Sequence, residues 1–354
     1  MHMADALLSP AVGGTMWTVS GGLLAYSAEK VREEADDRKV PLMGVLGAFI
    51  FAAQMINFTI PATGSSGHMG GGMILAILLG PWSAFLVMAS VLTVQALFFA
   101  DGGLLALGCN IFNLGFFTCF VAYPLIYKKI AGDSLNGRRI MLGATLAGIV
   151  GLQLGAFGVV VQTLASGISE LPFKTFVMLM QPIHLAIGLV EGLVTAGVVS
   201  FILKARPEIL AAATERKPIG VSVKGALAGL GAAAVLTGAA LSWFASANPD
   251  GLEWAMLRTS GKEELESGAK VHGLLASLQE KTSFLPDYGF KKAEAAPEPA
   301  AEEGGTQAAP EAEEQAPWPA VDAGTSVAGL VGGLLTLALA GLIGFALRRR
   351  NAAA

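Results

Sequence analysis

The sequence predicts an all-α fold, a polytopic membrane protein with about nine helical spans. Of the 354 residues, 53% are hydrophobic and only 14% are charged, against about 25% charged residues in an average soluble domain. Apolar stretches of about 17 to 25 residues, the length that crosses a hydrocarbon core, recur along most of the chain. Lysine and arginine gather in a few of the intervals between these stretches, as they do in the cytoplasmic loops of membrane proteins.

The first 206 residues (1–206) are expected to form a body of seven spans. Glycine and proline separate its elements: Gly80-Pro81 divides the short third stretch from the fourth, and Asp101-Gly102-Gly103 divides the fourth from the fifth. The stretches cover about 10–28, 40–58, 71–79, 82–99, 104–127, 140–165 and 175–204.

Residues 221–354 are expected to form a second module with two spans. Charged and proline residues interrupt the apolar pattern over 207–220, which is therefore predicted to be a cytoplasmic linker. Between the two spans, residues 245–322 contain 15 acidic and 6 basic residues. Within this segment, 293–316 is rich in alanine, glutamate and proline and cannot bury a core, so we expect a disordered tether. The two spans lie at about 224–244 and 325–347.

The basic clusters set the expected sidedness. They follow the first, fifth, seventh and last spans, and the positive-inside rule places them in the cytoplasm. Nine alternating crossings then put the N-terminus, the loop 60–70 and the segment 245–322 outside, with the C-terminus inside, in the plasma membrane. The first residues lack the positive leader of a signal peptide, so we expect Met1 to remain on the mature protein. Nothing resembles a basic nucleic-acid surface.

His2 has surroundings that only a chain end supplies. The amine of Met1, the deprotonated amide nitrogen of His2 and its imidazole can close fused five-membered and six-membered chelate rings, with three nitrogens nearly in one plane. A fourth nitrogen would complete a square-planar site of the kind associated with Ni(II) or Cu(II). His68 is the expected donor, because its loop of glycine and serine (64–70) lies on the same outer side. A solvent-exposed loop histidine is the alternative interpretation.

Other polar residues are weaker candidates. His184 and Glu191 lie seven residues apart on one helix face within a span, where ionisable groups are functional candidates; hydrogen bonds between helices would account for them equally well, and we expect a coupling or structural role. His272 is expected to be exposed on an external helix at 263–279, and the two cysteines, Cys109 and Cys119, to be small buried residues. Candidates to orient the imidazoles as outer-shell groups are Asp5, Gln54, Asn57, Ser66 and Gln95.

Several motifs resemble one known family. Residues 1–205 resemble the CbiM/NikM family, the metal-specific substrate-binding subunits of energy-coupling-factor (ECF) transporters. In the second module, Asn248-Pro249-Asp250-Gly251-Leu252-Glu253 and 324–329 resemble the two-span NikN or PDGLE domain. The motifs that carry the first resemblance are Met1-His2-Met3-Ala4-Asp5, Gly64-Ser65-Ser66-Gly67-His68, Gly80-Pro81-Trp82-Ser83-Ala84, 95–103 and Gly108-Cys109-Asn110-Ile111-Phe112-Asn113.

The resemblance implies that Met1, His2 and His68 hold one Ni2+ or Co2+ ion as transported cargo, with no resident cofactor. It also implies work with two cytoplasmic ATPase subunits and a membrane coupling subunit, and the sequence has no phosphate-binding loop of its own, so no enzymatic activity is expected. The planar site and the PDGLE-type module favour nickel. The leading alternative is a self-sufficient permease or channel; a vitamin-binding subunit or a membrane enzyme fits less well.

Overall fold

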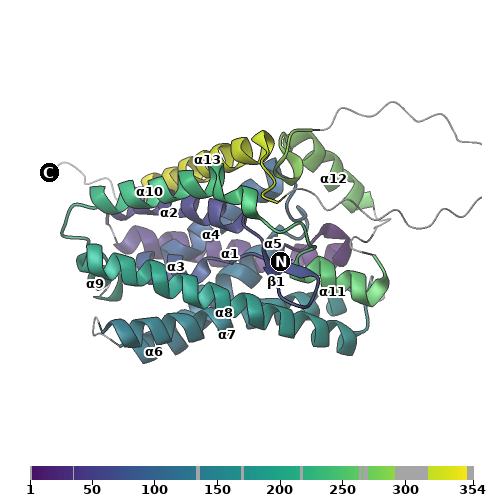
Figure 1. The fold of residues 1–354 in the computed structure, drawn as a ribbon, viewed down its shortest axis with the longest axis horizontal. Helices are drawn as coiled ribbons and strands as arrows, with labels where there is room; N and C mark the ends of the chain where they lie inside the picture. Colours follow the sequence, from purple (N-terminus) through teal and green to yellow (C-terminus); the bar gives the residue numbers. More distant parts are fainter. Residues whose placement is uncertain are drawn as a thin grey trace, which may run out of the picture.

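The computed structural model describes residues 2–34, 36–132, 136–168, 171–215, 218–262, 265, 270–291 and 318–348. Met1 and the predicted tether 293–316 lie outside these residues. The described chain is almost entirely helical (Figure 1). The helices of the body are η1 (Asp5–Leu7), α1 (Pro10–Glu34), α2 (Lys39–Gln54), α3 (Gly72–Leu79), α4 (Pro81–Phe98), the continuous α5 (Leu107–Ile111), η2 (Phe112–Tyr127) and α6 (Lys128–Ala131), then α7 (Gly137–Ser166) and α8 (Phe173–Ala205).

Five helical segments of the described chain are long and apolar enough to cross a membrane. They confirm a polytopic α-helical membrane protein, while the count of nine crossings stays a prediction. The shorter helices α2 and α10 (Lys224–Ala239) are apolar too, at 16 residues each. The five segments are α4, 107–131, α7, α8 and α13 (Ala323–Leu347).

The short third stretch forms α3, which lies in the middle of the bundle. All eight of its residues are buried, and it contacts α2, α4, η2, α7, α8 and α9 (Pro207–Glu215). Gly71, with φ of 78°, precedes it, and Gly80, with φ of 80°, ends it before Pro81 begins α4. Because α3 is enclosed by other helices, it does not need the length of a lipid-exposed span.

The helices α7 and α8 approach each other closely through small residues. A Cβ atom on Gly192 would lie 2.6 Å from the carbonyl oxygen of Thr145, and one on Gly148 would lie 3.0 Å from the Cα of Gly192. Small residues let membrane helices pack with their backbones in contact. Leucine side chains on the other faces of the two helices are exposed, as expected for surfaces that meet lipid; they include Leu142, Leu185, Leu189 and Leu193.

The second module packs against the body along α2. Its helices α10 and α13 both contact α2 and lie beside it in Figure 1, and they meet each other where Gly238 faces Gly329. The predicted linker 207–220 contains α9, a short helix with Ile209 and Leu210 buried. The chain between α10 and α13 includes η3 (Leu241–Phe244), α11 (Gly251–Ser260), α12 (Lys270–Thr282) and η4 (Pro286–Tyr288).

One small β-hairpin departs from the all-helical pattern. Its strands β1 (Phe58–Ile60) and β2 (Ser65–Gly67) are antiparallel, with Phe58 opposite Gly67. The hairpin lies beside the N-terminal residues and α11, at one end of the helical bundle (Figure 1). This end therefore gathers the chain terminus, the loop that carries His68 and the connecting segment of the second module.

We expect that Gly192→Ala lowers the melting temperature of the purified chain, because its new methyl group would overlap the backbone at Thr145. Overpacking of this kind costs about 1–3 kcal/mol. Gly197→Ala, five residues further along α8 where a Cβ meets nothing within 4 Å, is the matched control and should not be destabilised. Equal melting temperatures for the two variants, measured in the same detergent, would contradict the close packing of α7 and α8.

Candidate metal site

The candidate site lies in a cavity of about 560 Å³ between the body and the connecting segment of the second module. Its walls come from the N-terminal residues, the end of α2, the loop after β2, the loop after α4, and from α11, α12 and η4. Five carboxylate side chains line it, with no lysine or arginine among the lining residues. An acidic cavity of this kind concentrates cations. The carboxylates are those of Asp5, Asp101, Asp250, Glu253 and Asp287.

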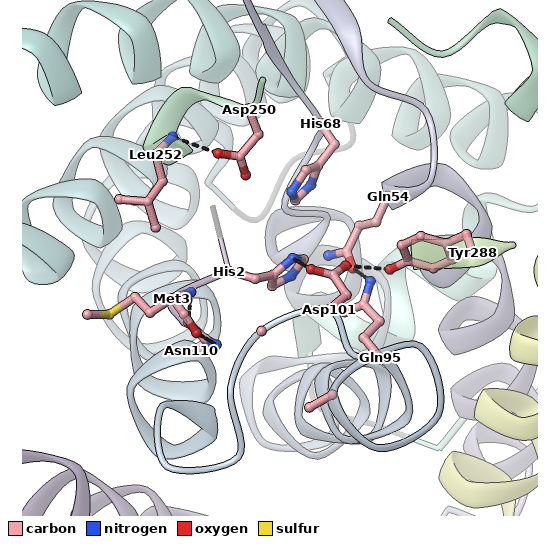
Figure 2. A network of polar contacts seen from close by, with 12 residues as sticks. His2, Met3, Gln54, His68, Gln95, Asp101, Asn110, Asp250, Leu252 and Tyr288 are labelled. Carbon is pink, nitrogen blue, oxygen red and sulfur yellow. Dashed lines mark hydrogen bonds and ion pairs between the residues drawn. The ribbon is translucent and has the colours of Figure 1, made fainter. Parts of the chain in front are cut away.

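His2 and His68 face each other in this cavity (Figure 2). Their ring centroids are 5.0 Å apart and the rings are nearly parallel, at 14°. His68 is buried, and its Nδ1 lies 3.0 Å from the carbonyl oxygen of Met69. Burial, with a further contribution from His2, lowers the pKa of His68 to about 3. A neutral imidazole is the form that binds a metal ion, so His68 has the protonation state that metal binding requires at neutral pH.

Asp101 joins this pair of imidazoles, although the sequence placed it only in a helix break and in the motif 95–103 and predicted no part for it in the site. Its Oδ1 lies 2.8 Å from Nδ1 of His2, and the hydroxyl of Tyr288 donates a hydrogen bond to its Oδ2 (Figure 2). Burial alone raises the pKa of Asp101, but His2 and the hydrogen bond from Tyr288 hold it well below its usual range. The carboxylate is therefore ionised and fixes the orientation of the His2 ring.

The other nitrogen of His2 is also informative. Nε2 is buried and has no hydrogen-bond partner among the described residues. Buried polar atoms are normally satisfied, so an unpaired imidazole nitrogen in an acidic cavity fits a site that accepts a cation. A six-membered ring with the His2 amide can, however, be closed only by Nδ1, which here contacts Asp101.

The backbone beside His2 is held by Asn110. Its side chain accepts a hydrogen bond from the Met3 amide at 2.8 Å and donates one to the Met3 carbonyl at 3.2 Å. The amide of Gly103 donates to the same carbonyl at 2.9 Å. These bonds, together with the complete burial of Met3, fix the residue next to His2 in the chain.

Glu191 on α8 binds the backbone of the His68 loop. This buried carboxylate accepts hydrogen bonds from the amides of Gly70, at 2.6 Å, and Gly71, at 3.1 Å, at the N-terminus of α3. From the other side, Gln54 donates to the Gly70 carbonyl and accepts from Gln95, each at 2.7 Å. Glu191 and Gln54, both singled out in the sequence, thus bind the same residue, Gly70, two positions after His68, and Gln95 supports Gln54.

Three more predicted outer-shell residues make hydrogen bonds with backbone groups. The Asp5 carboxylate accepts from the Ala106 amide at 2.9 Å and ties the N-terminal turn to the loop after α4. The Ser66 hydroxyl donates to the Asn248 carbonyl at 2.7 Å. Asn57 lines the cavity, and its carbonyl accepts from the Ser246 amide at 2.7 Å. Their action on the imidazoles stays a prediction, and two of them bind the second module.

His184 is buried between the His68 loop and the second module, and it lines a small cavity together with His68, Gly70 and Gly251. Its Nδ1 is 2.8 Å from the Met180 carbonyl of its own helix, and its Nε2 is buried with no hydrogen-bond partner in the described chain. A Cβ on Gly251 would lie 3.1 Å from its Cε1, so the PDGLE motif packs directly on this histidine. Cys109 and Cys119 are free and buried, as predicted.

The prediction that His272 is exposed was wrong. The residue lies on α12 with 5% of its surface exposed, and its Nε2 lies 2.8 Å from the Leu8 carbonyl and 3.1 Å from that of Asp5. The helix has the mixed polarity of a solvated helix, but it packs on the N-terminal turn. That contact joins residues 264 or more positions apart and leaves no signal in the local sequence.

Among the described residues, no group of three or more His, Cys, Asp or Glu side chains is placed to hold a metal ion. Two imidazoles at one place need further donors. Backbone and terminal nitrogens, as in the predicted chelate, would supply them, although Met1 lies outside the described residues. The donor set therefore fits nitrogen ligation better than a carboxylate cage.

Comparison with known proteins matches both parts of the chain. The profile described as the cobalt uptake substrate-specific transmembrane region, CbiM, matches residues 2–209, and that of the PDGLE domain matches residues 224–349. A putative fused nickel transport protein NikMN of Archaeoglobus fulgidus is 33% identical over 99% of this chain and 98% of its own. The cobalt transport protein CbiM of Sorangium cellulosum is 29% identical over 59% of this chain and 94% of its own.

Solved structures give the same match for the body. One transition metal transporter is 32% identical, with a TM-score of 0.52, and the match covers 61% of this chain and 99% of that one. A truncated transition metal transporter matches with the same identity and TM-score over 58% of this chain. The fold of the body is therefore shared with proteins described as moving transition metals.

We expect that Glu191→Gln weakens metal binding by about tenfold or more, within the range for outer-shell partners of metal ligands. The amide cannot accept from Gly70 and Gly71 with the strength of a carboxylate, and hydrogen bonds to charged groups contribute about 1.5–3 kcal/mol each. Nickel titration of the purified chain measures the change. Glu29→Gln on the exposed surface is the control, and equal affinities for the two variants would show that Glu191 does not support the site.

Proposed function

The chain belongs to the CbiM family, and from this membership we propose that it is the metal-capturing subunit of an ATP-driven ECF importer for Ni2+ or Co2+. The match to nickel and cobalt transport proteins supports metal uptake across a membrane. The five long apolar helices agree with a multi-pass location. We further propose the plasma membrane, with the N-terminus outside and the C-terminus in the cytoplasm, from the positions of the basic clusters.

The observation that carries this proposal is the pairing of His2 and His68 in an acidic cavity. We propose that Met1, His2 and His68 hold the ion: the Met1 amine, the His2 amide and Nδ1 of His2 on one side, and the His68 imidazole on the fourth. Rotation of the His2 ring by half a turn about Cβ–Cγ presents Nδ1 to the ion. The same rotation brings Nε2 to the side of the ring that faces Asp101. The Asp101 carboxylate can then accept a hydrogen bond from the Nε2–H group, as carboxylates commonly do from metal-bound histidines.

Nickel is the proposed principal cargo. The four nitrogens lie in one plane, which is the arrangement that Ni(II) adopts with nitrogen donors. A relative that matches 99% of the chain is described as a putative fused nickel transport protein. Cobalt binds the same ligand types, so a direct comparison of the two ions is part of the test below.

Transport is proposed to need two ATPase subunits and a membrane coupling subunit. Support comes from the family membership and from the sequence, which contains no Gly-x-x-x-x-Gly-Lys-Ser/Thr motif. In the proposed cycle, the chain captures the ion outside, and the partner subunits reorient the body to release it inside. The rival proposal is a permease that works alone on an ion gradient.

Metal binding to the purified chain tests the site. Calorimetry with Ni(II) and with Co(II) should give one ion per chain, with Ni(II) bound more tightly. One extra residue before Met1 should abolish this binding because it removes the terminal amine from its chelating position, and His68→Ala should abolish it because the fourth donor is lost. One residue added after Ala354 is the control for the extension. Unchanged affinity in the N-terminally extended chain would overturn the chelate.

Uptake in proteoliposomes separates the importer from the permease. The chain alone should bind Ni(II) but not accumulate it, because no step within the chain couples to an energy source. Accumulation should require the ATPase and coupling subunits together with ATP. Uptake by the chain alone, driven by an imposed proton or sodium gradient, would instead favour the permease.

A further inference from the structure

We infer that Tyr288, in the second module, is a positioning residue of the metal site that acts on His2 through Asp101. This inference rests on the proposed function and extends it, because it gives the second module a direct part in metal capture. The contacts that support it run from one module to the other without interruption (Figure 2).

The Asp101 carboxylate has one partner on each oxygen. Oδ2 accepts the hydrogen bond from the Tyr288 hydroxyl, and Oδ1 lies 2.8 Å from Nδ1 of His2. A carboxylate bound at both oxygens cannot rotate for one partner without disturbing the other. Removal of the hydroxyl therefore frees the group that orients His2, even though Tyr288 does not reach the imidazole itself.

The ring of Tyr288 is placed by the body of the protein. It stacks on Phe99, with centroids 5.1 Å apart and an angle of 18°, and meets Phe51 edge-on at 6.1 Å. Beside it, the Asp287 amide donates to the Phe99 carbonyl at 2.9 Å. The phenol is thus held by aromatic packing that does not need its hydroxyl, so loss of the hydroxyl alone should leave the ring in place.

The second module also binds the last turn of α4 and the loop that carries Asp101. The side chain of Gln279 on α12 donates to the Ala96 carbonyl at 2.8 Å and to the Gly102 carbonyl at 2.7 Å. Asp287 and Tyr288 both have positive φ angles, 50° and 58°, which are unfavourable for residues with a Cβ. The surrounding contacts hold them in this conformation, in which the hydroxyl reaches Asp101.

The position of Asp101 matters for how the ion is taken up. Its carboxylate contacts the nitrogen of His2 that the proposed chelate needs, and after rotation of the ring it would accept a hydrogen bond from Nε2. In both arrangements the carboxylate must stay where Tyr288 holds it. The second module therefore influences how well His2 presents Nδ1 to the ion, without contributing a ligand.

A double-mutant cycle on the full chain tests this role. The variants are Tyr288→Phe, which keeps the aromatic stacking, Asp101→Asn, and the two combined; Tyr26→Phe, which removes an exposed hydroxyl, is the control. The measurements are Ni(II) affinity by calorimetry, the visible absorption spectrum of the bound Ni(II), and the melting temperature. Outer-shell substitutions typically weaken metal binding by about 10–100-fold, so we expect that range for Asp101→Asn and about threefold to tenfold for Tyr288→Phe.

Because Tyr288 is expected to act through Asp101, the double variant should bind Ni(II) no more weakly than Asp101→Asn alone. A shifted Ni(II) spectrum in Tyr288→Phe at an unchanged melting temperature would support a positioning role. Additive losses, or an affinity and spectrum for Tyr288→Phe equal to those of Tyr26→Phe, would overturn it. If Asp101→Asn does not fold, Asp101→Glu replaces it in the cycle.

The unmodified chain separates failure of this inference from failure of the proposed function. If the unmodified chain binds no Ni(II), the proposed function is overturned as well. If the unmodified chain binds Ni(II) normally and Tyr288→Phe has no effect, only this inference is overturned.

Discussion

The structure depends on one buried electrostatic contact, the hydrogen bonds between the Glu191 carboxylate and the amides of Gly70 and Gly71. A carboxylate within a membrane helix is costly, but here it meets the N-terminus of α3, where unpaired amides and the helix dipole favour negative charge. This contact joins α8 to the central helix and sets the start of α3. Since His68 lies two residues before Gly70, the contact that stabilises the core also places a candidate ligand.

The rest of the site is assembled around that loop by segments distant in the sequence. The N-terminal residues are held by Asn110 and Gly103, so that His2 lies against His68. The second module covers both: the hairpin pairs with the backbone of Pro249 through the Ser66 amide at 2.8 Å, and Trp254 donates to the Thr63 carbonyl at 3.0 Å. The cavity is therefore a joint product of both modules.

Local sequence features predicted the helices and the two histidines but not their surroundings. Hydropathy located the apolar helices, and the glycine-proline pair at Gly80-Pro81 located the end of α3, because both signals depend only on neighbouring residues. The position of His2 at the chain end and the glycines around His68 pointed to chemistry for the same reason. Asp101, His272 and Tyr288 gave no such signal, since their roles arise when the segment between α10 and α13 folds back onto the body.

The joining of both modules in one chain determines how much of the covering segment is present at the cavity. The covering segment is connected through α10 and α13, which both pack on α2, so its effective concentration at the site is that of an intramolecular partner and does not fall on dilution. A separate covering subunit could regulate access by its abundance. Here the stoichiometry is fixed at one covering segment per site, so the supply of that segment cannot limit or regulate the site independently of the chain that carries the histidines.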